Sequence, residues 1–237
     1  MLNKVTIKNL YSEIREMLFK MIPEKWDSIY LYASIIVDKK KNETGEMFFY
    51  YYPKSMIKKN PINVYEIPAK FNIDENSYMI LASRLYELIK CLRHECIKLD
   101  NTNWTNITIS IENVEFLAEY NFDDLMQSIY TIEDRRKIWE YKYLNYPIER
   151  FNKVERNMIK QYLHEEENGQ HKTTDYSETF YQKHIHNDIK YNMEHEEYIQ
   201  EEKTNKSNEE QVKQSQDIKK ENADFPQIKN QLLKFNK

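Results

Sequence analysis

Two neighbouring stretches of the chain alternate between two kinds of side chain. Residues 26–37 separate an apolar set from a set of serines and tyrosines: Ile29, Leu31, Ala33, Ile35 and Val37 against Ser28, Tyr30, Tyr32 and Ser34. Residues 46–53 alternate in the same way: Met47, Phe49 and Tyr51 against Phe48, Tyr50 and Tyr52. Period-two alternation places successive side chains on opposite faces of a strand. The polar link 38–45 is typical of a hairpin connection. We predict a central hairpin with one apolar face and one tyrosine-rich face.

Apolar residues spaced three and four apart predict helices over residues 7–21, 75–99 and 132–144, and a further helix over 157–166. Asp74 is a suitable N-cap for the second helix, and Thr131 with Asp134 forms a capping motif before the third. Alternation predicts strands at 104–112 and 114–120, and Val64–Ile67 is expected to be a short edge strand. The order α-β-β-(β)-α-β-β-α indicates an α+β fold, an antiparallel meander sheet of four to five strands packed with helices.

The pattern ends near residue 166. Residues 167–221 are rich in Glu, Lys, Asn, Gln and Ser, with few apolar positions. Such a composition buries too little apolar surface to offset the entropy of ordering the chain. We therefore predict an α+β domain over residues 1–166, followed by a polar extension over residues 167–237 that is disordered or loosely helical.

The composition argues against several classes of function. The chain contains only two glycines, Gly45 and Gly169, so it lacks the glycine-rich loops of phosphate-binding sites and the nucleophile elbow. The net charge of −4 gives no reason to expect direct nucleic-acid binding. No stretch approaches the ~20 apolar residues of a membrane span, and no signal segment opens the chain. We expect a cytoplasmic protein without a cofactor or a membrane partner.

The cysteines and histidines give weak metal signals. Cys91 and His94 lie one helical turn apart, but no second pair with metal-ligand spacing accompanies them. His171, His184, His186 and His195 lie in the polar extension, where solvated histidines are more common than zinc ligands. We expect no metal site from either group.

Asp123 and Asp124 form an acidic pair after the fourth predicted strand, and three roles remain open for them. Carboxylates at such a position commonly cap backbone N–H groups. A carboxylate patch can also mimic phosphate and occupy the basic cleft of a nucleic-acid enzyme. The third alternative is a metal-dependent hydrolase in which the pair binds the ion.

The tyrosine-rich face leaves two arrangements open. Tyrosine is enriched at protein interfaces because it offers a large contact area and a polar tip. Alternatively, the helix predicted at 132–144 covers the rings through Ile138, Trp139 and Tyr143. Our candidate partner-binding residues are Tyr30, Tyr32, Tyr50, Tyr52, Asp123 and Asp124.

Six motifs, in order and in register, resemble the YezG-like immunity protein family, which includes the staphylococcal EsaG-type antitoxins. They are Met21-Ile22-Pro23-x-x-Trp26 with Tyr30, Gly45-Glu46-Met47-Phe48-Phe49-Tyr50, Ile67-Pro68-Ala69-Lys70-Phe71-Asn72-Ile73, Trp104-Thr105, Tyr120-Asn121-Phe122-Asp123, and Tyr141-Lys142-Tyr143-Leu144. The resemblance covers residues 8–165. The chain departs from the family at Asn145, where a glycine is usual, and at Asn103, where a proline is usual.

The resemblance implies a function without catalysis. Members of the family are cytoplasmic inhibitors that bind and neutralise a nuclease toxin exported by a Gram-positive type VII secretion system. The partner would then be a nuclease toxin from the same or a related strain. A different function, a protein-interaction adaptor or export chaperone that binds through the polar extension, is the alternative that the residues leave open.

Overall fold

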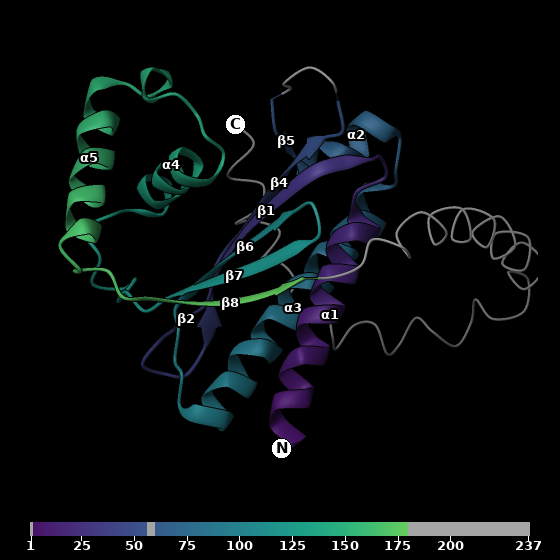
Figure 1. The fold of residues 1–237 in the computed structure, drawn as a ribbon, viewed down its shortest axis with the longest axis horizontal. Helices are drawn as coiled ribbons and strands as arrows, with labels where there is room; N and C mark the ends of the chain where they lie inside the picture. The colour runs from purple at the N-terminus through teal and green to yellow at the C-terminus, as the bar shows by residue number, and fades with distance from the viewer. Residues whose placement is uncertain (1, 56–59, 180–237) are drawn as a thin grey trace, which may run out of the picture. The chain divides into compact units, whose positions relative to one another are not determined.

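The computed structural model describes residues 2–55 and 60–179, which lie in a compact unit spanning residues 1–180; a second unit, 181–237, lies outside the described residues. Figure 1 shows the elements. In chain order they are α1 (Leu2–Met21), β1 (Trp26–Ser34), β2 (Ile36–Val37), β3 (Glu43–Thr44), β4 (Met47–Pro53), β5 (Ile62–Asn63), the 3₁₀ helix η1 (Val64–Glu66), α2 (Ile67–Phe71), α3 (Glu75–Asp100), β6 (Asn106–Glu112), β7 (Glu115–Asn121), α4 (Ile132–Tyr143), the 3₁₀ helix η2 (Ile148–Arg150), α5 (Lys153–Glu167) and β8 (Thr173–Thr179).

The main sheet has six strands in the order β5-β4-β1-β6-β7-β8, and every neighbouring pair is antiparallel. The predicted hairpin is confirmed. Leu31 lies opposite Phe49 and Tyr30 lies opposite Tyr50, so the apolar and tyrosine sets occupy separate faces. β2 and β3 form a separate two-stranded ribbon in the link between β1 and β4. The predicted α+β class is confirmed.

The helices α1 and α3 cover the apolar face of the sheet (Figure 1). Their apolar stripes pack against Leu31, Phe49, Ile109 and other inward-facing strand residues in one core. Trp104 lies immediately before β6 and is fully buried in the same core. This side of the molecule is therefore closed by the chain itself.

The helix starts follow the predicted capping residues. The Asp74 carboxylate accepts the backbone N–H of Ser77 at 2.8 Å, and α3 begins at Glu75. Thr131 and Asp134 form a complete capping box at the start of α4. Asn145, where the resembling family has glycine, has φ +53°, a left-handed conformation that asparagine tolerates better than most residues.

Two segments differ from the sequence-based expectation. Val64–Ile67 was predicted as an edge strand, and this is wrong: β5 ends at Asn63, and Val64 begins a helical turn. The Asn63 side chain accepts the backbone N–H of Tyr65 at 3.1 Å, and Pro68 lies in the first turn of α2, so both residues favour helix. The second difference is β8.

β8 lies within the residues expected to form the polar extension, yet it pairs with β7 over seven residues. Backbone hydrogen bonds to an existing sheet edge require few apolar side chains. Tyr176 adds one apolar contact, because its ring stacks on Tyr11 of α1 at 4.1 Å. Arg15 of α1 forms an ion pair with Glu178. The sheet therefore continues past residue 166.

Candidate partner-binding surface

The helix α4 covers part of the tyrosine-rich face of the sheet. Trp139 packs in a second cluster with Tyr30, Tyr32, Phe48, Tyr50 and Leu144. Its indole N–H donates a hydrogen bond to Thr108 Oγ1 of β6 at 3.0 Å. α5 packs on the outer side of α4 through a third cluster that contains Ile138, Phe151 and Ile159. Of the two arrangements that the sequence left open, the structure shows the covered one.

The four candidate tyrosines are covered to different extents. Tyr30, Tyr32 and Tyr50 are buried, whereas Tyr52 is half-buried. The Tyr50 hydroxyl donates to Glu140 at 2.9 Å and accepts from Arg136 at 2.7 Å. Tyr52 donates to the carbonyl of Leu144 at 2.6 Å. These hydrogen bonds connect α4 and the residue after it to the hairpin. Three of the four tyrosine rings are therefore part of the protein core, and only the ring of Tyr52 is partly exposed.

Two tyrosines hold carboxylates in place on the same face of the sheet. Tyr30 donates to Glu112 Oε1 at 2.6 Å, and Tyr143 of α4 donates to Glu119. Burial, followed by the neighbouring Glu112 carboxylate, raises the pKa of Tyr30, so the hydroxyl remains a donor at neutral pH. The tyrosines on this face therefore position one acidic side chain at the end of β6 and another within β7.

Asp123 and Asp124 have separate local roles. The Asp124 carboxylate accepts the backbone N–H groups of Met126 at 3.0 Å and Gln127 at 3.2 Å, so it caps a turn. Asp123 Oδ2 lies 2.6 Å from His171 Nδ1, which ties the start of β8 to the end of β7. Asp124 is exposed and Asp123 is half-buried. Whether either residue contacts a partner stays a prediction.

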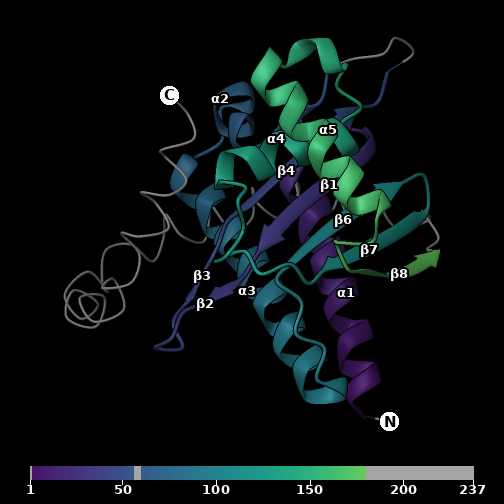
Figure 2. The same cartoon turned by 90° about the vertical axis from the view of Figure 1, so that its left-hand side faces the viewer.

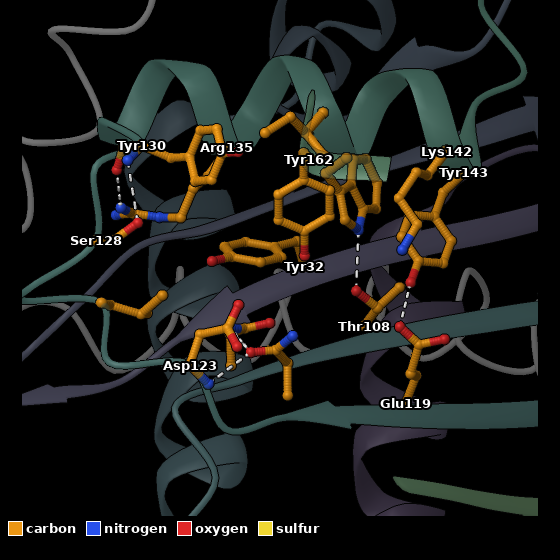
Figure 3. Close-up of a pocket in the computed structure, with 15 residues that line it drawn as sticks. Tyr32, Thr108, Glu119, Asp123, Ser128, Tyr130, Arg135, Lys142, Tyr143 and Tyr162 are labelled. Atoms are coloured by element: carbon orange, nitrogen blue, oxygen red, sulfur yellow. Dashed lines mark hydrogen bonds between the residues drawn. The ribbon is translucent and has the colours of Figure 1, made fainter. Parts of the chain in front are cut away.

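A pocket of about 50 Å³ opens between α4, α5 and the ends of β6 and β7 (Figure 3). It brings together Tyr32 and Asp123 from the candidate set, with Glu119, Arg135, Lys142 and Tyr162 among the other lining residues. The Tyr32 hydroxyl is buried and has no hydrogen-bond partner among the described residues. Lys142 is engaged by Glu166 at 2.5 Å, and Arg135 donates to the Tyr130 carbonyl at 2.7 Å.

A half-buried acid lies beside this pocket. Glu46 precedes β4, and one of its carboxylate oxygens lies 3.8 Å from Arg135 Nη2. Burial raises the pKa of Glu46 to about 7, against the opposing effect of Arg135 and Arg136. The group therefore changes charge near neutral pH.

Among the residues that the structure describes, no helix covers the other half of the tyrosine-rich face. In Figure 2 the hairpin end of β6 and β7 and the end of β8 project beyond α4 and α5. We call this surface the open face. Its exposed charged and apolar residues are Glu112, Glu115, Leu117 and Asp175, and the half-buried Glu119 lies where it meets the pocket. The candidate set does not include these glutamates, although Glu115, Leu117 and Glu119 alternate with the buried Phe116 and Ala118, a pattern typical of a strand with one open face.

The described residues contain no cluster of three or more His, Cys, Asp or Glu side chains arranged to hold a metal ion. Cys91 is exposed, and His94 pairs with Glu43 at 2.8 Å. His184, His186 and His195 lie outside the described residues. In the part of the chain that the structure describes, no helix is long and apolar enough to cross a membrane.

The comparison with protein families matches residues 7–158 to the family described as "Immunity protein YezG-like". The chain belongs to the YezG-like immunity protein family. The matched region begins within α1, contains the strands β1 to β7 with α3 and α4, and ends within α5, whereas β8 lies beyond it. The family is one of immunity proteins and not of enzymes.

Three curated relatives agree with this assignment. The chain is 31% identical to the immunity protein YezG of Bacillus spizizenii over 157 residues, which is 65% of this chain and 91% of the relative. It is 33% identical to YezG of Bacillus subtilis over 139 residues, 58% of this chain and 87% of the relative. It is 27% identical to the type VII secretion system protein EsaG of Staphylococcus aureus over 138 residues, 57% of this chain and 80% of the relative.

Proposed function

We propose that this YezG-like protein neutralises a nuclease toxin of a type VII secretion system by binding directly to it. Membership of an immunity protein family carries the proposal, and the similarity to EsaG, a type VII secretion system protein, supports the source of the toxin. The nuclease class rests on the family resemblance. The acidic open face is compatible with it, because an enzyme that binds nucleic acid needs a positively charged substrate surface.

The candidate contacts divide by burial within this proposal. Asp124 is exposed and the ring of Tyr52 is half-buried, so both are available to touch a toxin directly. The buried Tyr30, Tyr32 and Tyr50 would contribute indirectly, because they hold α4 and Glu112 in position. Asp123 acts at the edge of the pocket, where His171 already fixes its carboxylate.

Protection of cells tests the proposal. The full chain is co-expressed in a bacterial host with a panel of nuclease domains from type VII toxins of Bacillus and Staphylococcus strains, and survival and DNA degradation are measured. We expect rescue from at least one toxin, a stable complex on size-exclusion chromatography, and loss of nuclease activity on mixing the purified proteins. An absence of rescue and of complex formation across the panel would count against the proposal.

A further inference from the structure

We infer that the open face of the sheet, formed by β7, β8 and the end of β6, docks against the positively charged substrate-binding surface of the toxin. This inference rests on the proposed function and specifies which surface performs it. Four features of the face support it: its charge, its register, the fixed position of two of its carboxylates and the pocket at one end.

The charge on these strands has one sign. β6, β7 and β8 contain no lysine, arginine or histidine, and they carry the carboxylates Glu112, Glu115, Glu119, Asp175 and Glu178. Glu178 lies on the helix-covered side, where it pairs with Arg15. The other four lie on the open face. Among the described residues, none of these four has an ion-pair partner.

The register opposes these carboxylates to one another. Glu112 lies directly opposite Glu115, and Glu119 lies directly opposite Asp175. Like charges in directly opposed positions destabilise a sheet. The face therefore carries two repulsive pairs with no ion-pair partner among the described residues, and a cationic partner would convert both pairs into favourable contacts.

The open face is also preorganised. Tyr30 fixes the Glu112 carboxylate and Tyr143 fixes that of Glu119, so less side-chain entropy is lost on binding. Leu117, which is 37% exposed, lies between Glu115 and Glu119 on β7 and gives the face an apolar centre. An apolar centre with charged surroundings is the usual anatomy of a protein interface.

The pocket adds an independent sign of a ligand at one end of this face. The pocket shares Glu119 with the open face, and the unpartnered hydroxyl of Tyr32, a residue only 4% exposed, lines it together with Asp123. Of the two cations of the pocket, Lys142 is engaged by Glu166 and Arg135 donates to the Tyr130 carbonyl through Nη1, whereas the buried Nε of Arg135 has no hydrogen-bond partner among the described residues. A partner lysine that enters past Glu119 would meet carboxylates and would donate to the Tyr32 oxygen.

The test uses the full chain with Glu115→Lys and Asp175→Lys combined. The matched control combines Glu13→Lys and Glu87→Lys, two exposed glutamates on the helices that cover the opposite face, so both variants change the net charge equally. Affinity for a rescued toxin domain is measured by titration calorimetry. We expect the open-face variant to bind about 100-fold more weakly and the control to remain within about threefold of the wild type.

Two further measurements separate the possible failures. Inhibition by the wild type should be relieved by excess nucleic-acid substrate, as expected when both compete for one surface. Equal affinities of the open-face variant and the wild type would overturn the docking surface and leave the immunity function standing. If no toxin is bound at all, a decalysine peptide is the probe: NMR shifts centred on β7 and β8 and abolished by the open-face variant support the surface, whereas shifts centred elsewhere overturn it.

Discussion

Glu115→Lys should make the protein more stable, because it converts a repulsive cross-strand pair into an attractive one. Glu112 and Glu115 are directly opposed in the β6–β7 hairpin, which places their Cβ atoms about 5 Å apart. Two unit charges at that distance interact by about 0.8 kcal/mol in a medium with the permittivity of water. Reversing one sign therefore changes the pair by about 1.5 kcal/mol at low salt, and the neutral Glu115→Gln change gives about half of this gain.

Urea unfolding at 25 °C measures this change, followed by tryptophan fluorescence. Trp104 and Trp139 are suitable reporters because they are buried on opposite faces of the sheet. A gain of 1.5 kcal/mol corresponds to a rise in Tm of about 3–6 °C for a domain of this size. In 1 M salt the Debye length falls to about 3 Å, so most of the gain should disappear.

The control for this prediction is the same substitution on a helix. Glu87 of α3 pairs with Lys90 at 2.6 Å, so Glu87→Lys should lower stability slightly, by about 0.5 kcal/mol. The electrostatic reasoning would be refuted by a Glu115→Lys protein that is no more stable than the wild type, or by a gain that persists unchanged in 1 M salt. Confirmation would mean that the native sequence maintains a destabilising charge pair on the open face.

Three further predictions concern the backbone, the half-buried acid and the chain end. Gly45→Ala should lower the free energy of unfolding by about 3 kcal/mol or more, because an added Cβ would collide with the Ser34 carbonyl and the Tyr86 hydroxyl. At Gly169 an added Cβ meets no atom within 4 Å, so Gly169→Ala should cost only about 1 kcal/mol, for its φ of +70°. Equal losses in urea unfolding would contradict this reasoning. The pKa of Glu46 in the folded state is about 7, above its ordinary value of 4.5, so the folded state binds the proton more tightly than the unfolded state does. The free energy of unfolding should therefore fall between pH 5 and pH 8, by on the order of 3 kcal/mol. Glu46→Gln should remove this fall. A wild-type profile identical to that of Glu46→Gln would reject the assignment. A chain that ends after Thr179 should inhibit the toxin as well as the full chain does, and loss of binding by this chain would favour the adaptor function. A chain that ends after Glu166 lacks β8 and should be less stable.

Local patterns were sufficient to predict most of the elements of this protein. The alternation in residues 26–37 and 46–53 determined the hairpin and its two faces, and the residues Asp74 and Thr131 determined where two helices begin. These features depend on neighbours in the chain, because side-chain direction and capping bonds act over a few residues. The family motifs also belong to this level, and they led to the family that the comparison shows.

The use of each face was decided only by the tertiary structure. Whether α4 covers Tyr30 and Tyr50 or leaves them to a partner depends on contacts such as Trp139 with Thr108, 31 residues apart, which no local pattern encodes. β8 was missed for the same reason, because its stabilising partners are the edge of β7 and the ring of Tyr11, far away in the chain. The open acidic face exists because α4 covers only part of the tyrosine-rich side, so Glu112 and Glu115 stay exposed, and β8 enlarges it by adding Asp175; long-range packing determines that boundary.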